Sequence, residues 1–305
     1  MDNSLVKKFR NQIQLQLMTL PGILFLAIFS YIPMAGILIA FKDYNIGSGF
    51  FGSSWAGLKY FRDMFSDPMF MQSAGNTLIL SLYNIVIGFP VPIILALILN
   101  EIPGRNLKKI IQTSAYLPYF ISFVIVASMW ITFLDPKGFV NDFLMMTGII
   151  HEPIEFWTEP KYYRMLSTLV NVWKSAGYNA IIYLAAIAGI NQEMYEAAYV
   201  DGAGRMRRIF NITLPNMSGV ISIMFILGIG GLVRGSLDTS VLLGSPFNSS
   251  VSYVVEYYTL DMGLNLGRYS FATAVSLFQS VLSLILVFGT NWLTGKINGN
   301  KIILL

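Results

Sequence analysis

The feature that most constrains this chain is a series of long apolar runs, six of which are long enough to cross a lipid bilayer. A crossing helix needs about 20 mostly apolar residues, because no water in the hydrocarbon core can satisfy the main-chain polar groups. Charged residues are 12% of the 305 residues, whereas soluble domains carry about 25%. The sequence therefore predicts an all-α integral membrane protein whose six transmembrane helices span Leu20–Phe41, Thr77–Leu99, Thr113–Leu134, Ser167–Gly189, Gly219–Thr239 and Phe271–Leu293.

The positions of lysine and arginine predict the orientation of these helices, because basic residues are retained on the cytoplasmic side of a membrane. With the N-terminus inside, the inner segments carry eleven basic and five acidic residues, and the longer outer segments carry eight and eleven. Both termini are therefore predicted to be cytoplasmic. The first apolar run lacks a small-residue cleavage pattern, so we expect it to remain as a helix of the mature protein.

The segment ahead of the first span has its own pattern. Leu5, Phe9, Ile13 and Leu17 recur every three or four residues, opposite basic and amide side chains. This spacing predicts a basic amphipathic helix that lies in the inner membrane interface. The alternative is a solvated tail.

Composition also limits the chemistry that the chain can perform. It has no cysteine and a single histidine, His151, which lies in a polar loop. A metal site needs several clustered ligands, so neither thiol chemistry nor a metal is expected. The segment from Gly289 to Ile297 is similar to a nucleotide-binding loop only by chance, because its glycine spacing is wrong and it ends an apolar helix instead of opening one.

The most informative segment is the polar stretch between the fourth and fifth spans. Residues 193–200 favour a helix, and Asp201-Gly202 favours a chain reversal because glycine tolerates positive φ. A basic helical stretch with three arginines follows, and Pro215 stands just ahead of the next span. The pattern predicts a helix–turn–helix elbow whose small residues let another protein surface approach closely.

The elbow resembles the "EAA" loop of ABC importer permeases, in which Glu-Ala-Ala, Asp-Gly-Ala, a Phe and a Pro stand at set distances. The matching positions here are Glu196, Ala197, Ala198, Asp201, Gly202, Ala203, Phe210 and Pro215. The first helix, Trp55–Phe61, Asn76-Thr77 and Asn171–Gly177 are also similar to the carbohydrate-uptake permeases, in particular to the branch associated with oligosaccharides and polysaccharide fragments.

This resemblance implies the type I ABC importer permease fold and a non-catalytic role. The chain is then expected to form half of a carbohydrate pathway by alternating access, with a second permease subunit, two cytoplasmic ATPases that bind ATP and Mg²⁺, and an extracytoplasmic solute-binding protein. It implies a bacterial cytoplasmic membrane as the location. We expect four segments: residues 1–19 as the amphipathic segment, 20–70 as the first helix with its outer loop, 71–295 as the permease core with the coupling loop 191–215, and 296–305 as a cytoplasmic tail.

The resemblance assigns coupling to the ATPase to Glu196, Ala197, Ala198, Asp201, Gly202, Ala203 and Pro215, with Glu196 expected to pair with a basic residue of that subunit. Candidates for the substrate pathway come from the residues themselves. Charged groups within spans are costly and default to functional hypotheses, and aromatic and amide groups suit a sugar. The candidates are Tyr83, Asn84, Trp130, Trp173, Lys174, Tyr178, Asn179, Arg234 and Asp238.

Several alternatives stay open for these residues. Arg234 and Asp238 are four apart and could pair on one helix face, or Asp238 could meet Lys174. The aromatic residues could instead pack between helices or lie at the membrane interface. For the whole chain, the alternatives are a permease for a non-sugar solute, a secondary transporter, or a membrane-embedded enzyme, and the last two lack the expected repeats, buried acids or clustered ligands.

Overall fold

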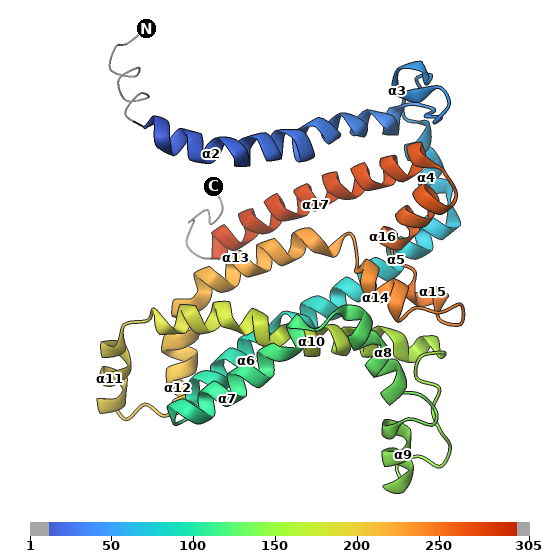
Figure 1. Cartoon of the computed structure of the whole chain (residues 1–305). Helices are drawn as coiled ribbons and strands as arrows, with labels where there is room; N and C mark the ends of the chain where they lie inside the picture. Colours follow the sequence, from blue (N-terminus) through green and yellow to red (C-terminus); the bar gives the residue numbers. More distant parts are fainter. Residues whose placement is uncertain (1–11, 298–305) are drawn as a thin grey trace. The chain divides into compact units, whose positions relative to one another are not determined.

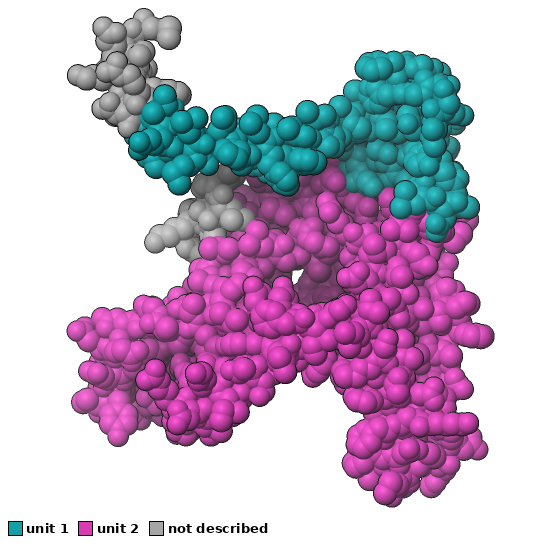
Figure 2. Space-filling model, viewed as in Figure 1, with its two compact units in different colours: residues 1–64, 262–277 teal, residues 65–261, 278–305 magenta. Residues whose placement is uncertain are grey.

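The computed structural model describes residues 12–297 as a series of helices joined by turns (Figure 1), which confirms the all-α prediction. In that range the β pairing is limited to one isolated bridge between Lys42 and Trp55. The chain divides into two compact units, residues 1–64 with 262–277 and residues 65–261 with 278–305 (Figure 2). Residues 1–11 and 298–305 lie outside the described range, and with them much of the predicted amphipathic segment and tail.

The first unit contains the first span and the loop that follows it. Its elements are α2 (Ile13–Leu26), η1 (Ala27–Tyr31), η2 (Ile32–Phe41), α3 (Gly49–Gly52), α4 (Lys59–Ser66) and the beginning of α17 (Tyr269–Ile297). The helical run starts at Ile13, earlier than the predicted Leu20, and Ala40 is its one buried residue. Because nearly all its apolar side chains are uncovered, this helix suits contact with hydrocarbon.

The loop after the first span is held by polar contacts. The Asp43 carboxylate accepts hydrogen bonds from the Tyr60 hydroxyl at 2.5 Å and from Lys59 Nζ at 3.1 Å. These two hydrogen bonds, of which the one from Tyr60 has the larger effect, hold the pKa of Asp43 below its ordinary value. The main-chain N–H of Tyr44 donates to Ser270 Oγ at 2.9 Å, so the loop is joined to the start of α17.

The second unit is built around α10 (Pro160–Ala188). Two buried clusters join it to its neighbours, one with α6 and α13 through Tyr183 and Met217, the other with α8 and α14 through Tyr163 and Leu243. The other elements are α5 (Pro68–Tyr83), η3 (Asn84–Gly88), α6 (Pro90–Glu101), α7 (Arg105–Tyr116), η4 (Leu117–Phe120), α8 (Phe123–Phe133), α9 (Phe139–Met146), α11 (Gln192–Val200), α12 (Arg205–Arg208), η5 (Ile209–Thr213), α13 (Leu214–Leu232), α14 (Leu237–Leu242), α15 (Ser249–Ser252), α16 (Val255–Leu260) and the rest of α17, with the π-helical turn η6 (Asp261–Asn265) crossing the boundary between the units.

Three prolines in the helical runs are accommodated in the same way. Pro33, Pro90 and Pro215 all stand two residues after a π-helical turn, which is η1, η3 and η5 respectively. A proline ring clashes with the carbonyl four residues earlier, and that carbonyl lies at the centre of each of these turns. Widening the helix by one residue there removes the clash, so the helix continues. Pro215 therefore lies inside a helical run from Arg205 to Leu232, not ahead of it as predicted.

The predicted third span, Thr113–Leu134, is not one helix. The chain bends by 101° between the helical stretches Arg105–Phe120 and Phe123–Phe133. Pro118 lies in the short 3₁₀ turn η4, and Ile121 and Ser122 are extended. Pro118, unlike Pro33, Pro90 and Pro215, has no π-helical turn before it, and the helical stretch ends at Phe120.

By length and composition, four helical runs in the described residues can cross a membrane, and the bent pair can supply a fifth crossing. The one predicted span not among these, the fourth (Ser167–Gly189), corresponds to α10, whose 29 residues are about 43 Å long. Its polar residues, among them Asn171, Lys174 and Asn179, make it less apolar than the others. The fifth span ends at Leu232 instead of the predicted Thr239, because Gly235 turns the chain with a φ of +79°.

Asn76 and Thr77 show how buried polar groups position a loop segment of this unit. The Asn76 amide donates to the carbonyls of Ser250 and Tyr253 at 2.9 and 3.2 Å, and Thr77 Oγ1 accepts from the N–H of Val255 at 3.0 Å. Buried main-chain groups need such partners. The segment from Ser250 to Val255 is thereby fixed to α5.

Gly177 provides a test of the packing of α10. A Cβ at this position would overlap the main-chain carbonyl of Ala115 in α7, and backbone cannot yield as a flexible side chain does. We expect Gly177→Ala to lower stability by about 1–3 kcal/mol, the usual effect of overpacking, measured by thermal unfolding of the purified protein in detergent. The matched control is Gly219→Ala in α13, where a Cβ meets no atom within 4 Å. Equal melting temperatures for the two variants would contradict the prediction.

Candidate functional site

The elbow predicted between the fourth and fifth spans is present as α11, a turn and α12 (Figure 1). The turn is a Schellman cap: the N–H of Ala203 donates to the Ala198 carbonyl at 2.8 Å, and that of Gly202 to the Tyr199 carbonyl at 3.0 Å. Gly202 has a φ of +75°, the left-handed conformation that such a cap requires. Glycine is therefore needed here for backbone geometry, and the angle between the two helices is fixed by the main chain.

The surface of α11 is left uncovered. None of its residues is buried, and Tyr199 and Val200 are 74% and 85% exposed. Glu196 and Ala197 are also exposed, and Ala198 is half-buried. Large apolar residues gathered on an exposed surface indicate an interaction site.

Two helices hold this elbow. α10 ends at Ala188, only a few residues before α11, and α12 continues through η5 into α13. A hydrogen bond of 2.9 Å between the Tyr195 hydroxyl and Thr213 Oγ1 joins α11 to the second of these helices. The elbow is thus tied to both of its supports.

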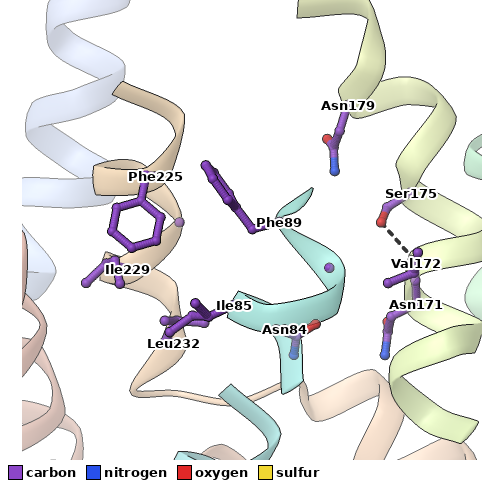
Figure 3. Close-up of a pocket in the computed structure, with 12 residues that line it drawn as sticks. Asn84, Ile85, Phe89, Asn171, Val172, Ser175, Asn179, Phe225, Ile229 and Leu232 are labelled. Atoms are coloured by element: carbon purple, nitrogen blue, oxygen red, sulfur yellow. Dashed lines mark hydrogen bonds between the residues drawn. The ribbon is translucent and has the colours of Figure 1, made fainter. Parts of the chain in front are cut away.

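The same two helices line a cavity of about 210 Å³ in the second unit (Figure 3). Asn171, Ser175 and Asn179 line it from α10, while Phe225 lines it from α13. Between these helices lie Asn84 of η3 and the adjoining Phe89; the remaining lining residues are Ile85, Gly88, Val172, Gly228, Ile229 and Leu232. The wall therefore combines amide and hydroxyl groups with two aromatic rings.

A smaller cavity of about 130 Å³ adjoins the first and shares Asn84, Asn171 and Leu232 with it. Its wall is mostly hydroxyl groups and glycine. The Asn171 amide donates to Thr239 Oγ1 at 3.0 Å, and the buried Ser240 hydroxyl has no partner in the described structure. Polar side chains of α10 thus line both cavities, from Ser167 and Thr168 in the smaller one to Asn179 in the larger one.

Only two of the predicted pathway residues line this cavity, and three others form aromatic pairs elsewhere. Asn84 and Asn179 line the cavity, and Asn179 points into it (Figure 3). Tyr178 stacks on Tyr119 at 3.8 Å between ring centroids, and Trp173 meets the edge of Trp130 at 5.7 Å. Tyr83 is half-buried near Asn84 but is not among the residues that line either cavity.

Lys174 does not meet Asp238. Its ammonium group donates to the main-chain carbonyls of Tyr119 and Ile121 at 2.7 and 2.8 Å, and it lies over the Tyr119 ring. These carbonyls belong to the break between η4 and α8, where no helical N–H is available to them. The lysine therefore satisfies main-chain acceptors that the break leaves open.

Arg234 and Asp238 do not share a helix face, contrary to one of the alternatives considered. The helix ends at Leu232, Gly235 reverses the chain, and Asp238 lies in the first turn of α14. Both side chains are exposed. Their spacing of four implied a contact only as long as the helix continued.

Apart from aliphatic residues and glycines, sequence reasoning missed four residues of the cavity wall: Asn171, Ser175, Phe89 and Phe225. A signal for the first two was available, since Asn171, Ser175 and Asn179 repeat every four residues and so share one face of a helix. The two phenylalanines carried no signal, because an aromatic residue in a span can face lipid, a neighbouring helix or a cavity.

Comparison with known proteins identifies close similarity along the whole length. Residues 64–299 match the family described as binding-protein-dependent transport system inner membrane component. Protein LplB of Bacillus subtilis is 41% identical over 284 residues, which cover 92% of this chain and 88% of that protein. The polygalacturonan/rhamnogalacturonan transport system permease protein YteP of the same organism is 41% identical over 293 residues, covering 96% and 91%.

The fold is also similar to that of solved structures. A chain in the crystal structure of a bacterial ABC transporter involved in the import of the acidic polysaccharide alginate aligns with a TM-score of 0.89 and 36% identity, over 97% of this chain and 99% of that one. A second structure, of a bacterial alginate ABC transporter in complex with an alginate pentasaccharide-bound periplasmic protein, aligns with a TM-score of 0.88.

Lys174 generates a prediction about stability. Replacing it by methionine keeps the length of the side chain but leaves the carbonyls of Tyr119 and Ile121 without their donor. Hydrogen bonds to charged groups contribute about 1.5–3 kcal/mol, so we expect Lys174→Met to lower the melting temperature in detergent by several degrees. The control is Lys161→Met on the same helix, where the lysine forms an exposed ion pair with Glu159 and little change is expected. A Lys174→Met protein as stable as this control would refute the assigned role.

Proposed function

This chain belongs to the family of binding-protein-dependent transport system inner membrane components, and from that premise we propose how its elbow and cavity act together. It is a multi-pass membrane protein and the non-catalytic permease subunit of a carbohydrate ABC importer, as its relatives are. We infer that its cargo is an oligosaccharide. The cavity wall supports this, because amides and hydroxyls exchange hydrogen bonds with sugar hydroxyls and aromatic rings stack on the apolar faces of pyranoses.

The observation that carries the proposal is the exposed elbow held by two cavity-lining helices. α11 has no buried residue of its own, so its apolar end requires a partner surface. We propose that this surface is a groove of a cytoplasmic ATPase subunit, with Glu196 paired to a basic residue there and Ala197, Ala198, Asp201, Gly202, Ala203 and Pro215 supporting the fit.

The route from the elbow to the cavity is short and stiff. The run Arg205–Leu232 is continuous, and its far end carries Phe225, Ile229 and Leu232 of the cavity wall. On the other side of the elbow, α10 carries Asn171 and Asn179. A displacement of the elbow by closing ATPases therefore moves two opposite walls of the cavity, which is what alternating access requires.

The remaining partners follow from the same assignment. A second permease subunit would complete the pathway, because this chain supplies only one set of spans, and a solute-binding protein would deliver the sugar from outside. We place the elbow and both termini in the cytoplasm on the distribution of basic residues. ATP and Mg²⁺ are assigned to the ATPase subunits; in residues 12–297 no three His, Cys, Asp or Glu side chains lie where they could hold a metal ion.

We propose that the solute-binding protein docks beside segment 252–261, and the structure of this segment limits which of its residues can serve. Tyr258 is fully buried, and its hydroxyl donates to Asp67 at 2.8 Å. Tyr253 donates to Asp261 at 2.8 Å, and burial together with this carboxylate raises the pKa of the Tyr253 hydroxyl. These aromatic side chains therefore anchor the segment, and because its residues are buried or half-buried, docking would rely mainly on its neighbours.

Gly202 provides the test of coupling. We expect Gly202→Asp to abolish stimulation of ATP hydrolysis by the loaded binding protein, and to abolish uptake, because a branched charged side chain strains a backbone at φ +75° and blocks the docking surface. The measurement is ATPase activity of the purified complex in proteoliposomes, alongside sugar uptake.

The matched control is Gly104→Asp. Gly104 also has a positive φ, +83°, also meets no atom within 4 Å of a built Cβ, and lies in the inner loop between α6 and α7. Strain alone would affect Gly104→Asp at least as much, because the Gly104 ψ of +123° lies outside the left-handed helical region that aspartate tolerates. Near-normal coupling in Gly202→Asp, or equal loss in both, would contradict the assignment of the elbow.

Asn179 provides the test of the pathway. Its amide points into the cavity, and we expect Asn179→Leu to reduce the rate of sugar uptake at least about tenfold while complex assembly is preserved, because a hydrogen-bonding group is replaced by an apolar one of similar size. The control is Asn216→Leu, whose amide bonds only the Ile212 carbonyl of its own helical run at 2.7 Å. Unchanged uptake in Asn179→Leu would exclude this cavity from the pathway.

A further inference from the structure

An apolar groove that the proposed function does not use lies on the second unit, between α6 and the beginning of the run Arg205–Leu232. Its volume is about 660 Å³, within the range of about 300–1,000 Å³ that is typical of small-molecule sites. The wall is almost entirely aliphatic or aromatic, and includes Ile94, Leu97, Ile98, Met206, Ile209 and Phe210.

The length of the groove corresponds to one leaflet of a bilayer. Its lining follows α6 from Pro90 to Glu101, a helix of 12 residues and so about 18 Å long. Half of the ~30 Å hydrocarbon core is about 15 Å. The groove thus reaches from the middle of the membrane to one face, with Ile94, Ile98, Met206 and Phe210 all more than half exposed along it.

The end of the groove at that face is basic. Arg205 lines it and is 75% exposed at its side chain, with a long ion pair of 3.8 Å to Glu101. α7 starts two residues beyond Pro103, which lines the groove, and three of its first five residues are basic. Three of the four residues of α12 are also basic. Arginine is well suited to phosphate, because its planar donors match phosphate oxygens.

We propose that this groove binds one anionic phospholipid of the inner leaflet, with an acyl chain along α6 and the phosphate at Arg205. The apolar wall fits an acyl chain, and the length of the groove matches a single leaflet. The basic end of the groove favours a negatively charged headgroup. The choice of leaflet rests on the proposed cytoplasmic position of the elbow. Because Arg205 begins the helical run that supports the elbow, the lipid would hold α6 and this run together at the point where coupling starts.

Fluorescence quenching by brominated lipids tests this proposal on the full transporter in nanodiscs. This chain contains no cysteine, so Ile98→Cys gives it a single site for a bimane label, which lies in the groove. The partner subunits are used without accessible cysteines. At equal mole fractions, we expect phosphatidylglycerol with brominated chains to quench this label about fivefold more effectively than brominated phosphatidylcholine, the preference that one basic side chain near a membrane confers.

Two controls isolate the site. Arg205→Gln is expected to remove the preference, whereas Arg207→Gln, on the same short helix but outside the groove lining, is expected to keep it. A label at Leu284→Cys, an exposed apolar position on α17, is expected to show no preference between the two lipids.

Equal quenching by both lipids at Ile98→Cys, or a preference that survives Arg205→Gln, would overturn the proposal. So would cross-linking of Ile98→Cys to the partner permease with no quenching by either lipid, because the groove would then hold protein. Quenching reports lipid occupancy without transport, so a failed lipid site and a failed coupling assignment give different results.

Discussion

The rest of the structure depends on the need to give every main-chain polar group in the hydrocarbon a partner. Prolines within the helical runs remove main-chain donors from them. At Pro33, Pro90 and Pro215 a π-helical turn absorbs the displaced carbonyl, and the helix continues. At Pro118 the helix breaks instead, and Lys174 of α10 donates to the carbonyls that the break exposes. Lys174, a charged residue of the fourth predicted span, therefore compensates for the break in the third by binding its open carbonyls.

This arrangement gives α10 a double role. One set of its residues, Lys174, Gly177 and Tyr178, holds the region of the broken span through hydrogen bonds, close backbone approach and stacking. Another set, Asn171, Ser175 and Asn179, lines the cavity. A helix fastened in this way can move only together with the elements packed against it. That stiffness suits a part that must pass a displacement from the elbow to the pathway.

The motifs that connect this chain with the carbohydrate permeases each have a local physical reason. Gly202 supplies the left-handed residue of a Schellman cap, and Gly177 lets α10 approach the backbone of α7. Asn76 and Thr77 bind main-chain groups of the segment Ser250–Val255. Ala197 and Ala198, by contrast, lie on α11, which has no buried residue. Under our proposal, their small size serves the approach of a partner surface.

The sequence by itself determined the helical membrane fold, the position of the elbow and its place among importer permeases, because apolar run length, turn chemistry and motif spacing are local properties of a chain. Glu196 to Ala203 were predicted from motif spacing, and Asn84 and Asn179 from the suitability of amide groups within spans for a sugar. Only the tertiary structure decided that Thr113–Leu134 is broken, that Lys174 binds carbonyls, and that Arg234 and Asp238 lie beyond the end of their helix. A proline can be accommodated by a π-helical turn or by a break, a half-buried cation binds the acceptors that the neighbouring segment presents, and a glycine can end a helix before its apolar run ends.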